Sequence, residues 1–285
     1  MALVIAILWL SPAYGGAWTK EFGASYTKVG TDFYLPGSYV DPTTGEKLED
    51  LNFIGQQTSV YSEFGVFKRW PLQVSIQLPL VYGVTTFVDE VSFNAGEQAR
   101  ATSLRLGDVR LQVQTAILRK GFQLSGGVEI KVPLYANDGV GAKFGIWKAA
   151  FPLPGDGQLD VTPWVIMGGS IPGTPLFAQG GIGYRFRTER FIGWDTRLRF
   201  VDGLAFNGTV GLTTGPLLTL FQWEGIKNFK EDEVTRENLY LGGALMWTVW
   251  KGLAIETRAG GEVWADNAAS GLSLGLGVSW RTPAP

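Results

Sequence analysis

The chain alternates apolar and polar residues with a period of two over most of its 285 residues. Between residues 108 and 131, for example, Arg110 and Glu129 belong to a polar set, and Leu111 and Ile130 belong to an aliphatic set. A period of two is that of a β-strand, whose successive side chains point to opposite faces. After the first residues, no stretch approaches the ~20 apolar residues of a transmembrane helix. The chain is therefore predicted to be all-β, and it can cross a membrane only as strands.

About twelve alternating segments follow one another, each near the ~9–11 residues with which a tilted strand crosses a bilayer. Their connections alternate between short turns, such as 68–71, 119–121 and 203–207, and longer loops, such as 136–156. Short turns at one end of the strands and longer loops at the other are typical of outer-membrane proteins. We therefore predict a transmembrane antiparallel up-and-down β-barrel of about 12 strands, with short periplasmic turns and longer extracellular loops. Strands are expected at residues 22–35, 53–67, 72–86, 104–118, 122–135, 157–169, 176–188, 193–203, 208–222, 238–249, 253–264 and 270–281.

The N-terminus, MALVIAILWLSPAYGG, contains an apolar run from Ala2 to Leu10 that small residues follow. This order is typical of a secretory signal peptide with a cleavage site near residues 15–17. The sequence therefore predicts a signal peptide over residues 1–16 and a single outer-membrane barrel domain over residues 17–285. A short buried helix or strand is the alternative for the apolar run. No extended plug segment is expected before the first strand.

Histidine and cysteine are absent from the chain. Nucleophilic hydrolases of the Ser-His or Cys-His type therefore cannot be built from it. A paired-carboxylate hydrolase stays formally open, but no acidic pair stands out from a general face of ion pairs. With 24 basic and 26 acidic residues, the net charge is −2. The sequence therefore has no excess of basic residues that would indicate nucleic-acid binding. We predict no enzyme activity, no cofactor, no metal site and no nucleic-acid partner.

In a membrane barrel the aliphatic face meets lipid and the charged face lines the lumen. A barrel of about twelve strands lies between small barrels filled by side chains and wide porins, so the charges could close a narrow lumen or line a small pore. Arg110 and Glu129 are expected within reach of each other, either opposite or diagonal. The predicted lumen or constriction residues are Arg110, Glu129, Lys131, Asp160, Arg185, Arg187, Asp195, Arg197, Arg199, Glu256 and Arg258.

Arginines gather in the region that follows the predicted sixth strand. A hairpin centred near Phe191 would pair Arg187 with Asp195 and would set Arg185 beside Arg197. Like charges destabilise such a pair unless an anion or a carboxylate lies between them. A carboxylate from the preceding strand gives a structural ion-pair cluster, whereas a free anionic site gives a constriction for anionic solutes.

Aromatic residues recur near the predicted strand ends, as expected of the girdles that meet lipid headgroups. The tryptophans assigned to these girdles are Trp70, Trp247, Trp250 and Trp280 at the short-turn rim, and Trp194, Trp223 and Trp264 at the long-loop rim. The loop at 136–156 also contains apolar side chains, which would fold inward as a gate or outward as a partner surface. The gating candidates are Phe144, Ile146, Trp147 and Phe151.

Several phrases of the sequence resemble one family. They are YSEFGVFKRWPLQVSIQLPLVYG, LGDVRLQVQTAI, KVPLY, GDGQLDVTPWVIMGGS and GIGYRFRTE, within residues 50–200. They resemble the outer-membrane barrels grouped as "MetA-pathway of phenol degradation" transporter-like proteins. The resemblance implies a β-barrel in the bacterial outer membrane that passes small, often aromatic or hydrophobic, compounds.

Together these features predict an outer-membrane channel or passive transporter for small, possibly hydrophobic, aromatic or amphipathic anionic solutes. Such a protein would be exported through the periplasm and surrounded by the lipid bilayer and lipopolysaccharide. The alternative is a structural or assembly barrel with a filled lumen, which docks other envelope proteins through its loops.

Overall fold

The computed structural model describes residues 17–40, 47–48, 52–88, 98–134, 157–191, 200–230, 235, 237–266 and 269–284. Extended strands, joined by turns, make up these segments, and no helix in them is long and apolar enough to cross a membrane. The strands are β1 (Ser25–Val40), β2 (Lys47–Leu48), β3 (Asn52–Gly65), β4 (Leu72–Val88), β5 (Gln98–Leu106), β6 (Asp108–Leu118), β7 (Gln123–Pro133), β8 (Gln158–Ser170), β9 (Leu176–Phe191), β10 (Gly203–Thr214), β11 (Leu217–Asn228), β12 (Glu237–Trp250), β13 (Leu253–Asp266) and β14 (Ala269–Thr282).

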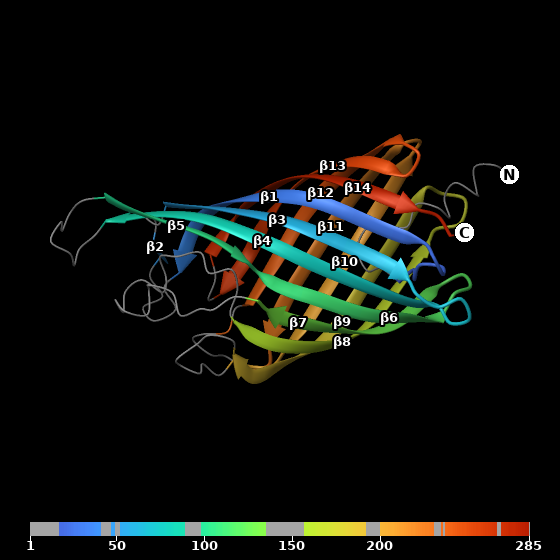
Figure 1. Cartoon of the computed structure of the whole chain (residues 1–285), viewed down its shortest axis with the longest axis horizontal. Helices are drawn as coiled ribbons and strands as arrows, with labels where there is room; N and C mark the ends of the chain where they lie inside the picture. Colours follow the sequence, from blue (N-terminus) through green and yellow to red (C-terminus); the bar gives the residue numbers. More distant parts are fainter. Residues whose placement is uncertain are drawn as a thin grey trace.

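The strands close into an antiparallel barrel, because β14 pairs with β1 from Ser25↔Thr282 to Tyr39↔Ala269. The two-residue β2 extends the end of β1, and β5 and β6 succeed each other along β4, so twelve strands form the wall. The tilted strands run the length of the barrel, and β14 ends beside the start of β1 at the short-turn end (Figure 1). The predicted all-β, 12-stranded antiparallel barrel is confirmed.

A proline marks the break between β5 and β6. β4 pairs with β6 up to Gln77↔Arg110 and with β5 from Leu80↔Leu106 onward. Pro79 lies between these two pairings and has no N–H to donate to the neighbouring strand. Its carbonyl instead accepts a hydrogen bond from Gly107 N at 2.9 Å. The irregularity is therefore local, and the wall stays closed around it.

The outward face of the wall is apolar and uncovered. Leu111, Ile130 and Leu276 leave 40%, 39% and 60% of their surfaces exposed, and leucine, valine and aromatic side chains continue this face around the barrel. An exposed apolar surface of this extent is far larger than soluble monomers carry, and it is typical of strands that face lipid. The inward face therefore lines the lumen, where the predicted charges lie.

The prediction fails at two strands after residue 190. Residues 203–207, predicted as a short turn, belong to β10, and the predicted strand 208–222 is divided by the turn at Gly215 and Pro216. Gly215 has φ of 58°, a left-handed conformation that favours glycine. The inward side chains of β11 are apolar near this turn, so two-residue alternation disappears there. Most of the predicted strand 193–203 lies outside the described residues.

Candidate functional site

The inward-facing side chains divide the lumen into two parts. Next to the short turns lies a filled half, in which Tyr26, Gln114 and Leu218 leave at most 2% of their surfaces exposed. Farther toward the long loops lies a water-accessible half, in which Arg110 and Glu224 are exposed. The two halves share the same strands, so the difference comes from the side chains and from what they enclose.

Residues 17–20, which precede β1, lie inside the filled half. Ala17 is fully buried, and its N–H donates to Gln179 Oε1 at 3.3 Å. The carbonyl of Ala17 accepts a hydrogen bond of 2.6 Å from the Ser125 hydroxyl. The segment therefore crosses the lumen to reach β7 and β9. The sequence did not predict that residues 17–20 lie in the lumen, although they are too few to form an extended plug segment.

The other end of this segment is held by β3 and β4. The Lys20 N–H donates to Gln73 Oε1 at 2.9 Å, and the Lys20 ammonium lies 3.1 Å from Glu63 Oε2. Glu63 also accepts a 2.6 Å hydrogen bond from the Tyr61 hydroxyl, and the ammonium lies 5.7 Å from the centre of the Tyr26 ring. Because the carboxylate is 1% exposed, this ion pair is shielded from water.

An apolar cluster completes the filled half. The Trp18 ring meets the Phe177 ring edge-on, with 6.0 Å between centroids. Phe177 lies so close to Gly211 that a Cβ there would be 2.0 Å from the Phe177 ring. The buried members of the cluster are Tyr26, Phe177, Leu218, Leu220, Ala244, Met246 and Ala254. Apolar side chains thus point inward here because they pack against one another and against Trp18 instead of lining a pore.

Asp160 is the centre of a buried charge cluster on β7, β8 and β9. Its Oδ2 lies 3.0 Å from Lys131 Nζ and accepts hydrogen bonds of 2.9 and 2.5 Å from Arg185. Its Oδ1 lies 3.3 Å from Arg187 Nε. Lys131 also lies 3.5 Å from Asp108. With Asp160 only 1% exposed, the carboxylate that the arginines require comes from β8, as the structural alternative predicts.

A second charge network joins β1, β13 and β14. Lys28 Nζ lies 2.6 Å from Glu256 Oε1, and both side chains are nearly completely buried. Arg258 donates to Asp32 at 2.6 Å and lies 4.0 Å from Glu256. A Cβ on Gly275 would be 2.2 Å from Asp32 Oδ1, so this position of β14 has room only for hydrogen. The network is a packed part of the wall.

The charges of the water-accessible half are held less tightly. Arg110 Nη1 lies 3.6 Å from Glu129 Oε1, and the two side chains are 49% and 20% exposed. The register pairs Arg110 with Lys131 and Gln112 with Glu129, so the diagonal arrangement is the correct one. Glu224 lies on β11 between Asn207 and Tyr240, far around the wall from Arg110. Both side chains point inward from strands that are five apart in the twelve-stranded wall, so the two charges face each other across the lumen.

Most predicted lumen residues occupy inward positions: Arg110, Glu129, Lys131, Asp160, Arg185, Arg187, Glu256 and Arg258. Asp195, Arg197 and Arg199 lie outside the described residues. The predicted hairpin around Phe191 is wrong, because Arg185 pairs with Gly203 and β9 continues through Phe191. The pairing partner of Arg185 is therefore a glycine rather than Arg197.

Sequence analysis missed several lumen charges, among them Lys28, Asp32 and Glu224. Lys28 and Asp32 alternate with Val29 and Phe33 on β1, a pattern that could have revealed them, although outward threonines weaken it. Glu224 follows inward Leu220, and no alternation marks that stretch. Register alone assigns it to the lumen.

Four of the predicted girdle tryptophans lie in or next to the short turns: Trp70, Trp247, Trp250 and Trp280. Trp264 lies near the long-loop end of β13. The prediction is wrong for Trp223, which lies in the middle of β11. Its indole covers Gly208, where a Cβ would be 2.1 Å from the ring. Trp194 lies outside the described residues.

The gating candidates Phe144, Ile146, Trp147 and Phe151 also lie outside the described residues. Within the segments that are described, no group of three or more acidic side chains could hold a metal ion.

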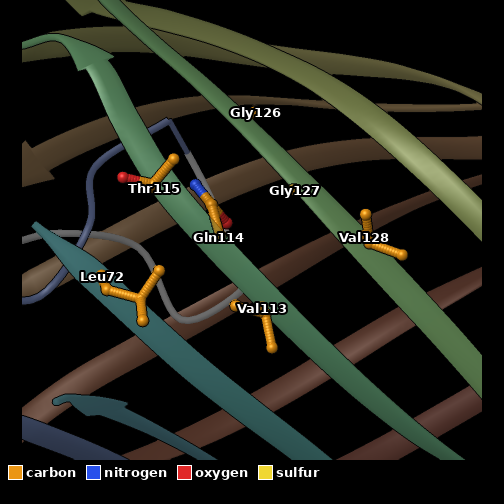
Figure 2. Close-up of a pocket in the computed structure, with 7 residues that line it drawn as sticks. All are labelled: Leu72, Val113, Gln114, Thr115, Gly126, Gly127 and Val128. Carbon is orange, nitrogen blue, oxygen red and sulfur yellow. The ribbon is translucent and has the colours of Figure 1, made fainter.

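A shallow groove on the outer surface is distinct from the lumen. It lies over β4, β6 and β7, where Leu72, Val113 and Val128 surround the bare backbone of Gly126 and Gly127 (Figure 2). Val113 and Val128 are cross-strand partners on the outward face. The groove therefore faces lipid, where an acyl chain would fill it, and it offers no path for a solute.

A solved outer-membrane protein shares this fold. The COG4313 outer membrane channel from Pseudomonas putida F1 superimposes with a TM-score of 0.71 over 95% of this chain and 100% of that chain, with 11% identity. The NanC porin gives a TM-score of 0.48 over 90% of this chain and 100% of its own, with 12% identity. No family model and no curated protein matches the sequence. The likeness to the first structure shows an outer-membrane type of barrel fold, and the resemblance to one named family stays a prediction.

Proposed function

We propose that this protein is an outer-membrane channel for passive diffusion of small solutes, and that residues 17–20 close it. The observation that carries the proposal is the position of this segment: it crosses the lumen without being a strand of the wall. A closed barrel with an apolar outer surface and water-accessible inner charges supports the same function. Removing the segment from the lumen would break no strand pairing.

The contacts of the segment are consistent with reversible closure. Its polar attachments are hydrogen bonds to Gln179, Ser125 and Gln73 and an ion pair with Glu63. A hydrogen bond contributes about 0.5–1.5 kcal/mol net, because water replaces it when it breaks. Displacing the segment therefore costs far less than opening the barrel wall. The Trp18 packing adds an apolar contribution to the closed state.

The location follows from the same proposal. We assign residues 1–16 to an export signal and the barrel to the bacterial outer membrane, where lipid and lipopolysaccharide surround it. Short turns then face the periplasm, so the segment closes the periplasmic side and solutes enter from the long-loop side. The resemblance to the "MetA-pathway of phenol degradation" group agrees with small-solute passage.

Conductance in planar bilayers tests the channel. The refolded chain is compared with a variant in which Ala17-Trp18-Thr19-Lys20 is replaced by Gly-Ser-Gly-Ser, which keeps the length and removes the anchoring side chains. Conductance is expected to increase in the variant. A Gln73→Ala, Gln179→Ala variant should give a smaller increase.

The matched control removes two inward glutamines that make no hydrogen bond to the segment, Gln77 and Gln222, and it should leave the closed state unchanged. A refolded segment variant that conducts no more than the parent would overturn the proposal.

The alternative function is a structural or assembly barrel of the envelope. One observation favours it: half of the lumen is filled by buried side chains. In that case the replaced segment would lower stability without producing conductance, because the remaining cluster would still block the lumen. The bilayer experiment therefore separates the two functions.

A further inference from the structure

We infer that the water-accessible half selects small dipolar solutes, which carry separated positive and negative groups, between Arg110 and Glu224. This inference rests on the proposed channel function and specifies the solute. It arises from a separation of charge around the wall, which neither buried network produces alone.

One arc of the wall has an excess of positive charge. Among the described side chains, the inward faces of β5 to β9 carry Arg105, Arg110, Lys131, Arg185 and Arg187 against Asp108, Glu129 and Asp160. Lys131, Arg185 and Arg187 surround one buried carboxylate, Asp160, and Lys131 also lies 3.5 Å from Asp108. Among the described side chains of this arc, five bases therefore stand against three acids.

The opposite arc has an excess of negative charge. The described inward side chains of β11 to β14 and β1 carry Asp32, Glu224, Glu256 and Glu262 against Lys28 and Arg258. Lys28 and Arg258 are engaged with Glu256 and Asp32. Glu224 has no ion-pair partner within 4 Å among the described residues, and its side chain is exposed.

Arg110 and Glu224 are the most exposed of these inward charges. The Arg110 side chain is 49% exposed, whereas Asp160 and Glu256 are 1% exposed. Arg110 on β6 and Glu224 on β11 point inward from nearly opposite sides of the twelve-stranded wall. Arg110 keeps hydrogen-bonding capacity, because its long 3.6 Å contact with Glu129 does not use the full guanidinium fork. A carboxylate would bind at Arg110 and an ammonium at Glu224.

The field between the arcs acts differently on different solutes. A single anion is attracted by one arc and repelled by the other, and a cation is treated in the opposite way. A dipolar solute gains at both walls when it aligns with the field. An uncharged molecule of the same size gains little, so the arrangement distinguishes solutes by charge separation rather than by net charge.

Liposome swelling tests this selection with two isomers. The zwitterion 4-aminobutyrate and the neutral 4-hydroxybutyramide have the same atoms and nearly the same size. In liposomes with the Gly-Ser-replaced variant, 4-aminobutyrate is expected to enter about tenfold faster, the lower end of the range for charge focusing in clefts. Adding Arg110→Ala and Glu224→Ala should abolish the difference between the isomers.

The matched control, Arg69→Ala with Glu21→Ala, removes one base and one acid that are exposed outside the lumen and should keep the preference. Equal entry of both isomers would overturn the inference and leave the channel standing. A preference that survives loss of Arg110 and Glu224 would likewise overturn it. Entry of neither isomer, together with no conductance, would instead remove the channel itself.

Discussion

The two halves of the lumen use the same strands for opposite purposes. In the filled half, Lys28 and Glu256 lie 2.6 Å apart and are 6% and 2% exposed, so their charges stabilise each other away from water. In the water-accessible half, Arg110 and Glu129 lie 3.6 Å apart and are 49% and 20% exposed. An ion pair in the lumen therefore says little about function until its burial is known.

Burial also decides how much unfolding free energy is lost when a lumen residue is substituted. A buried charge that loses its partner keeps its desolvation penalty, whereas an exposed charge is hydrated by the water of the lumen. Comparing buried with exposed side chains therefore makes quantitative predictions about stability.

The largest effect is expected at Asp160. Asp160→Asn keeps the size of the side chain but leaves Lys131, Arg185 and Arg187 around a neutral amide. Removing one partner of a buried charge cluster costs about 3–5 kcal/mol of unfolding free energy. Urea unfolding of the refolded protein, followed by tryptophan fluorescence, measures the change.

The control for that change is Glu224→Gln, which should stay within about 0.5 kcal/mol because its side chain is exposed. A similar loss in both variants would show that burial does not separate the two carboxylates energetically.

The apolar cluster should give the next largest effect. Leu220 is 3% exposed and packs in the cluster that also includes Phe177 and Met246. Leu220→Ala should cost about 3 kcal/mol, in the middle of the range for leucine in a packed core. Gln222→Ala, two residues along the same strand face, should cost less than about 1 kcal/mol in the same unfolding experiment. A small effect at Leu220 would mean that the cluster can collapse around the cavity.

The wall separates the lumen from lipid, and a pair of lysine substitutions tests which face is which. Ile130→Lys puts a charge on the outward face and should cost about 2–4 kcal/mol near the middle of the membrane. Gln112→Lys lies on the inward face, opposite Glu129, and should be tolerated. Unfolding from lipid vesicles measures both variants. Greater damage from the inward lysine would reverse the assignment of faces.

The smallest effect is expected at Arg110. Arg110→Ala removes a half-exposed contact with Glu129 and should change the unfolding free energy by about 0–1 kcal/mol. Its effect on solute selection should be much larger than its effect on stability. A loss comparable to that of Asp160→Asn would assign Arg110 to the structural network instead.

Two-residue periodicity determined most of the wall. Along β6 and β7 the alternation of Arg110 and Glu129 with Leu111 and Ile130 specifies both the strands and their faces, because a one-residue slip would exchange lipid and water for every side chain. Spacing then indicated a barrel with an even number of strands. These properties are local, so a single sequence contains them.

Tertiary structure alone decided which part of the lumen is filled. Residues 17–20 have no periodic pattern, and their position depends on side chains of β3, β4, β7 and β9 that are distant in the sequence. Leu218 and Leu220 point inward but are apolar, because the lumen beside them is a packed core rather than water. The alternation of polar and apolar residues is therefore absent there. Closure of the barrel likewise makes Glu224 face Arg110. Burial and charge separation across a lumen are properties of the closed wall, because they depend on which strands become opposite when β14 meets β1.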